Sequence, residues 1–107
     1  MPADVVEHRR ERSAALFNNR YFVDVVTAIG QLVGDTGDLV TTRQVASATG
    51  LADSLVRPVM LRLEAARLMT RLPRIGSTRG PQYFAIRSGD TWAHMAALVR
   101  DVSTATS

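Results

Sequence analysis

Apolar side chains that recur every three or four residues predict two strongly amphipathic helices in this chain. The first is expected over residues 21–33, with Gly34 as its stop, and the second over residues 90–102, with Asp90 or Thr91 as its cap. Residues 2–18 show the same spacing, but their apolar positions are sparse. We therefore expect a third helix there that cannot be buried on its own.

Two shorter helices are expected in the middle of the chain. Thr41 and Gln44 stand three residues apart, as in a capping box, and open a helix that Gly50 ends. Asp53 or Ser54 is a suitable cap for the next helix, which continues to about residue 67. The pattern thus predicts a tight helix pair.

The hydrophobic pattern then changes to the alternation typical of strands. Residues 68–73 and 82–87 flank a loop that contains Gly76 and Gly80, which predicts a β-hairpin. The predicted order is four helices, a hairpin and a last helix, so the expected class is mainly α with a small β-hairpin (α+β). We expect one domain over 1–107, made of a helical extension (1–18), a core (19–87), a C-terminal helix (88–102) and a flexible tail (103–107).

Composition fits a folded domain whose positive charge is concentrated in one segment. Apolar residues make up 46% of the 107 residues, and all 13 basic residues are arginine. Residues 1–40 carry 4 Arg and 6 acids (−2), residues 41–87 carry 8 Arg and 2 acids (+6), and residues 88–107 carry 1 Arg and 2 acids (−1). The middle segment is therefore expected to meet a polyanion.

Several function classes lose support from what the sequence lacks. There is no cysteine, and the two histidines, His8 and His94, are far apart, so we expect no metal and no cofactor. No phosphate-binding glycine loop or nucleophile motif is present, so we expect no enzyme. No segment has the pattern of a secretory signal or a membrane span, so we expect a cytoplasmic protein that makes no membrane contact.

Three residues in the middle segment have the spacing of a helix-turn-helix. Ala46 is small where the helices must cross, Gly50 tolerates a positive φ in the turn, and Val56 can dock the second helix on the first. Residues 63–69 and the arginine-rich hairpin that follows resemble winged helix-turn-helix regulators of the MarR and ArsR sort, and the resemblance covers residues 21–87. Arg67 departs from that family, which usually has glycine at this position.

The resemblance implies a sequence-specific regulator of transcription, expected to be a repressor, that binds double-stranded DNA. The second helix of the motif would enter the major groove, with Arg57 as the best candidate to contact guanine. The N-terminus of the preceding helix would meet backbone phosphate, and the hairpin tip would follow the backbone or enter the minor groove. The candidate DNA-binding residues are Thr41, Thr42, Arg43, Ser54, Arg57, Pro58, Leu61, Arg62, Arg74, Ser77, Thr78 and Arg79.

One such domain makes limited contact with DNA, so we also expect a homodimer formed by the terminal helices. The candidate interface residues are Val5, Val6, Leu16, Trp92, Met95, Leu98 and Val99.

Other interpretations stay open. Arg62, Arg67 and Arg87 are as well explained as a solvated surface, and His94 is best explained as an ordinary surface residue. The uncharged residues Pro58 and Leu61 would also suit a winged helix that binds a protein instead of DNA. A third hypothesis is a regulator with an apolar pocket between the terminal helices and the core, although the sequence identifies neither a small-molecule nor a protein effector.

Overall fold

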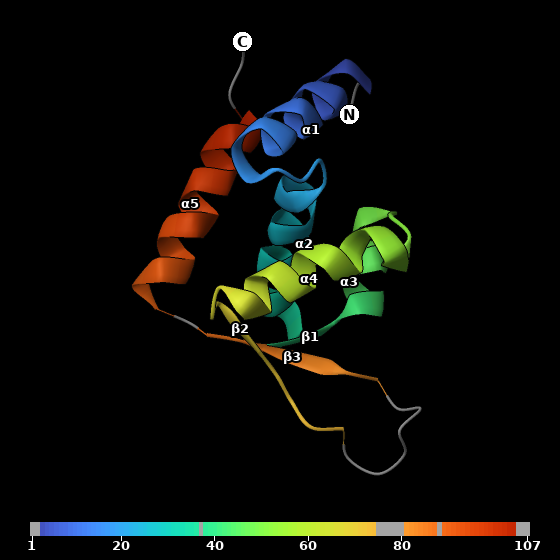
Figure 1. Cartoon of the computed structure of the whole chain (residues 1–107), viewed down its shortest axis with the longest axis vertical. Helices are drawn as coiled ribbons and strands as arrows, with labels where there is room; N and C mark the ends of the chain where they lie inside the picture. Colours follow the sequence, from blue (N-terminus) through green and yellow to red (C-terminus); the bar gives the residue numbers. More distant parts are fainter. Residues whose placement is uncertain (1–2, 37, 75–80, 88, 105–107) are drawn as a thin grey trace.

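Helices dominate the structure, a computed structural model that describes residues 3–36, 38–74, 81–87 and 89–104 (Figure 1). A small three-stranded antiparallel sheet accompanies them. This agrees with the expected mainly helical α+β class. In chain order the elements are α1 (Ala3–Phe17), α2 (Phe22–Thr36), β1 (Leu39–Thr41), α3 (Thr42–Thr49), α4 (Asp53–Ala65), β2 (Met69–Arg71), β3 (Tyr83–Ile86) and α5 (Asp90–Thr104).

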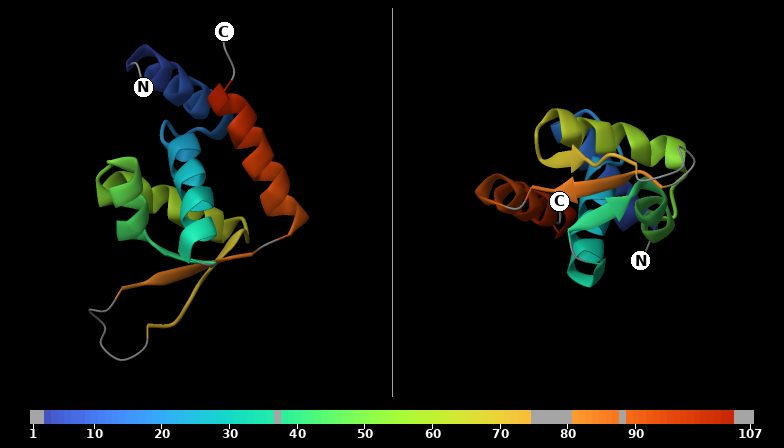
Figure 2. Two further views of the ribbon diagram at one scale, coloured as in Figure 1. Left: turned by 180° about the vertical axis from the view of Figure 1, so that it is seen from behind. Right: turned by 90° about the horizontal axis from the view of Figure 1, so that it is seen from below.

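Helix α2 is the centre of the molecule. It contacts α1, α3, α4, α5 and β1, and Figure 2 shows α5 on one side of it and the α3–α4 pair on the other. Its apolar face is buried in one hydrophobic core together with side chains from α4 and the sheet, and burial of such side chains is the main source of stability. The fully buried side chains include Val23, Val25, Val26, Ile29, Val45, Val56, Val59, Met60, Leu63 and Met69.

The sheet attaches the hairpin to the helices. Its strand order is β1-β3-β2, and Phe84 at its centre pairs with Val40 on one side and Arg71 on the other. The hairpin was predicted, but β1 was not. A strand of three residues that leads directly into a helix is too short to show an alternating pattern.

Some predicted boundaries are wrong. Helix α2 continues past Gly34 to Thr36, and α5 includes Ser103 and Thr104, which were assigned to the tail. Helix α4 begins at Asp53 after Ala52, which forms no side-chain cap, so neither Asp53 nor Ser54 is the N-cap. As a result Pro58 lies inside α4, one turn beyond the position where proline is well tolerated. Residues 105–107 lie outside the described residues.

Other local predictions are confirmed. Thr41 and Gln44 form the capping box, and Gly50 follows α3 with a φ of 74°.

The end of α4 has a left-handed residue, Arg67, with a φ of 66°. The Arg67 N–H donates a hydrogen bond to the Glu64 carbonyl, and the Leu68 N–H donates one to the Leu63 carbonyl, which is the Schellman arrangement. The backbone after α4 therefore has the left-handed residue for which glycine is usual, but here the residue is arginine.

Candidate nucleic-acid interface

A cleft of about 650 Å³ brings together three segments that are distant in sequence. The N-terminus of α3 forms one wall, the first turns of α4 form another, and the two ends of the hairpin loop complete it. Arg43, Arg57 and Arg74 meet there, although they span 31 positions of the chain. The lining residues are Thr41, Thr42, Arg43, Gln44, Asp53, Arg57, Arg74, Pro81 and Gln82.

The capping box fixes the α3 side of the cleft. The Thr41 hydroxyl accepts a hydrogen bond from the Gln44 backbone N–H at 3.1 Å, and the Gln44 side-chain oxygen accepts one from the Thr41 N–H at 2.9 Å. These bonds fix the start of α3. Because Thr41 is only 8% exposed, it is a poor candidate for direct contact with a ligand. Arg43, two residues further along the chain, is exposed and borders the cleft.

Helix α4 faces the core and the solvent as predicted. Its buried side chains are Val56, Val59, Met60 and Leu63. Ser54, Arg57 and Pro58 are exposed on the outward side, and Leu61 is half-buried. The exposed Arg57 therefore borders the cleft from the start of the helix.

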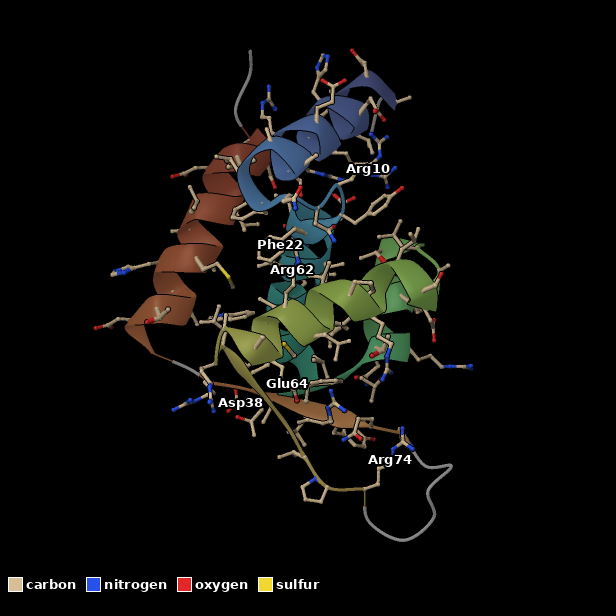
Figure 3. All side chains as sticks on the ribbon, viewed as in Figure 1. Arg10, Phe22, Asp38, Arg62, Glu64 and Arg74 are labelled. Atoms are coloured by element: carbon tan, nitrogen blue, oxygen red, sulfur yellow. The ribbon has the colours of Figure 1, made fainter. Side chains whose placement is uncertain are left out.

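Arg62 does not join the other candidates. Its guanidinium Nη1 donates a hydrogen bond to the backbone carbonyl of Phe17, at the end of α1. In Figure 3 the labels of Arg62 and Arg74 lie on opposite sides of α4. A long-range contact of this kind, between residues 45 positions apart, has no local signal in the sequence. Arg62 connects α4 to α1 and does not line the cleft.

The cleft carries an excess of positive charge. Three arginines line it against one carboxylate, that of Asp53. Among the described residues, the side chains of Arg43 and Arg57 form no ion pair and no hydrogen bond with each other or with a neighbour. Their charge is therefore directed to solvent, where an anion can reach it.

Four residues of the cleft were not among the predicted contacts: Gln44, Asp53, Pro81 and Gln82. Gln82 donates a hydrogen bond to the Leu72 carbonyl and so joins the two strands of the hairpin near the loop. The capping box was the available signal for Gln44, whereas Gln82 could be placed only once the strand register was known. Three predicted contacts, Ser77, Thr78 and Arg79, lie outside the described residues.

The terminal helices leave some apolar side chains exposed. Val5, Leu16 and Leu98 are 41%, 60% and 47% exposed, and they are candidates for an interface. Trp92 and Met95 are partly buried against the core. Val6 is half-buried.

Val99 was assigned to the interface incorrectly. It is 1% exposed, because it faces the core of its own chain, and it cannot contact a second copy.

Comparisons with protein-family models, with curated proteins and with solved structures find no match to this chain. Within the described ranges, no group of three or more histidine or acidic side chains is arranged to hold a metal ion. The described helices also include none that is long and apolar enough to cross a bilayer.

Proposed function

We propose that this chain is a cytoplasmic winged helix-turn-helix protein that binds double-stranded DNA in a sequence-specific manner and represses transcription. In this proposal α3 and α4 form the helix-turn-helix, α4 enters the major groove, and the β2–β3 hairpin is the wing. The single observation that carries the proposal is the cleft in which Arg43, Arg57 and Arg74 converge from these three parts.

The geometry of the cleft suits a duplex. Arg43 is the second residue of α3, at the helix N-terminus where backbone N–H groups and the helix dipole also favour an anion, and it would meet a phosphate. Arg57 lies in the second turn of α4 and would reach a base edge, where arginine can donate two hydrogen bonds to guanine. Arg74, at the start of the hairpin loop, would meet the backbone beside the groove.

The test is selection of bound duplexes from a random DNA pool, performed with the wild-type chain and with Arg57→Ala. We expect the wild type to enrich one sequence. The variant should lose the preference at one base position, with a discrimination of about 1 to 3 kcal/mol at that position, and keep residual affinity. A uniform loss at all positions would make Arg57 a phosphate contact. Failure of the wild type to enrich any duplex would refute sequence-specific binding.

A homodimer is part of the proposal. Val5, Leu16 and Leu98 expose apolar surface on α1 and α5, and a two-fold pair of such domains would contact two half-sites of an operator. Sedimentation at micromolar concentration should give twice the mass of the chain. A monomer under those conditions would refute this part alone.

A second candidate function is a protein-interaction module. The observation that favours it is the pair of uncharged residues on the outward side of α4, Pro58 and Leu61, which would suit an apolar partner. Salt distinguishes the two candidates. Contacts between arginine and phosphate release counterions, so DNA binding should weaken steeply as salt rises, whereas docking through Leu61 should not.

A further inference from the structure

The outward face of α4 is divided into a charged edge and an uncharged stripe. Ser54, Pro58, Leu61 and Ala65 follow one another at intervals of four, three and four residues, so they form one line along the helix. None of them carries a charge, and all are at least partly exposed. Arg57, beside this line, is turned toward the cleft.

Most of the stripe is turned away from the core of this chain. The core is filled from the opposite side of α4, by Val56, Val59, Met60 and Leu63. Pro58 is also costly where it stands, because proline inside a helix removes one backbone hydrogen bond and crowds the preceding turn. Pro58, which is exposed, and Leu61, which is half-buried, thus present apolar surface on the outward face of the helix.

In the major groove of DNA, an apolar side chain can find one apolar group to pack against. Phosphates and most base edges present charge, donors or acceptors, whereas thymine presents its C5-methyl group. Leu61 lies four residues from Arg57, which is about 6 Å along a helix. Base pairs are stacked about 3.4 Å apart, so a methyl contact would fall within about two base pairs of the base that Arg57 contacts.

We propose that Pro58 and Leu61 determine specificity by packing on thymine methyl groups within two base pairs of the guanine that Arg57 contacts. This inference rests on the proposed DNA-binding function and names the target of the same helix. The preferred half-site combines one guanine, bound through hydrogen bonds, with neighbouring thymine, bound through apolar contact. The uncharged stripe and the arginine edge thus recognise different groups in one groove.

Uracil tests the proposal, because it is thymine without the methyl group. The duplex selected from the random pool is compared with the same duplex in which uracil replaces the thymines next to the guanine. Burial of one methyl is worth about 0.8 kcal/mol, so we expect wild-type affinity to fall about fourfold for each contacted methyl. Equal affinity for the two duplexes overturns the proposal, as does a selected site without thymine in this window.

Variants assign the effect to the stripe. Pro58→Ala/Leu61→Ala should bind the thymine and uracil duplexes equally, and a penalty that persists in this variant overturns the assignment. Pro58→Ala alone is expected to strengthen the helix, so a reduced penalty in that variant cannot be due to unfolding. Arg57→Ala is the matched control and should keep the thymine preference while losing the guanine preference. If wild type binds no duplex, the proposed function itself fails and this inference fails with it.

Discussion

Arginines serve two different purposes in two regions of this molecule. Where α1 meets α2, Arg10 Nε donates a hydrogen bond to Asp24 Oδ2 at 2.9 Å, and Arg9 Nε lies 2.6 Å from Asp24 Oδ1. Arg20 bonds Glu7 nearby. At the cleft between α3, α4 and the hairpin, Arg43 and Arg57 have no such partner among the described residues.

The two regions differ because arginines stabilise the packing of α1 on α2, whereas the arginines of the cleft face the solvent. Helix α1 has a weak apolar face, and the buried side chain among its residues is that of Ser13, whose hydroxyl accepts from the Val23 N–H and donates to the Asn19 carbonyl. Polar contacts therefore hold α1 to α2, together with the stacking of Phe17 on Phe22. At the cleft, Arg43 and Arg57 are exposed and form no ion pair with a described residue, which leaves them available to an external anion.

The largest effect is expected when the paired region loses its shared acid. Asp24 is 9% exposed and faces two guanidinium groups, so Asp24→Asn would remove the buried carboxylate that Arg9 and Arg10 share. Loss of a buried partner costs about 3 to 5 kcal/mol. Because the arginines are about a quarter exposed, we expect roughly 2 kcal/mol by urea denaturation.

The cleft supplies the control for this experiment. Arg57→Ala should change the free energy of unfolding by less than about 0.5 kcal/mol, since the side chain is exposed. The comparison between the two regions breaks down if Asp24→Asn is as stable as wild type, or if Arg57→Ala unfolds as easily as Asp24→Asn.

A smaller effect is expected at Arg67, which belongs to neither group. Its left-handed backbone after α4 is strained for any residue with a Cβ atom. Arg67→Gly should therefore stabilise the fold by about 1 kcal/mol, seen as a higher urea midpoint, with Arg67→Ala as the matched variant that removes the charge and keeps the strain. A midpoint for the glycine variant no higher than that of the alanine variant would show that strain is not the dominant factor there.

The smallest effect concerns the exposed pair of Glu7 and Arg20. The hydrogen bond from Arg20 lowers the pKa of the Glu7 carboxyl below its ordinary value. Its contribution to stability is therefore present above the unfolded pKa of about 4.3 and is lost as pH falls through the lower folded value. Between pH 7 and pH 3, the Tm of Glu7→Gln should fall less than that of wild type. Parallel Tm curves would contradict a stabilising role for the pair.

Local signals in the sequence were sufficient for most elements of the fold. The spacing of apolar residues located the helices, and the capping box and Gly50 fixed the ends of α3 because those signals act over a few residues. The boundaries failed where a signal was ambiguous. Asp53 and Ser54 are both suitable caps, yet the helix begins after Ala52, since tertiary packing can override a cap preference.

The candidate site was harder to predict, because it depends on contacts between distant segments. The charge excess and the helix-turn-helix spacing indicated Arg43, Arg57 and Arg74, which the fold brings to one cleft. They could not show that Arg62 bonds the Phe17 carbonyl or that Val99 faces its own core, since both depend on how α1 and α5 pack. Net charge identifies a segment, but only the fold shows which of its arginines line the cleft.

The most direct test of the central claim compares the salt dependence of duplex binding for two variants of equal net charge. Arg43→Ala/Arg57→Ala removes two arginines from the cleft, whereas Arg20→Ala/Arg100→Ala removes two from α5 and the segment between α1 and α2, away from the cleft (Figure 1). In a plot of log K against log salt concentration, the cleft variant should lose about 1 unit of slope, from the phosphate contact proposed for Arg43, and the other variant should match wild type. Equal losses in both variants would contradict a cleft-specific interface.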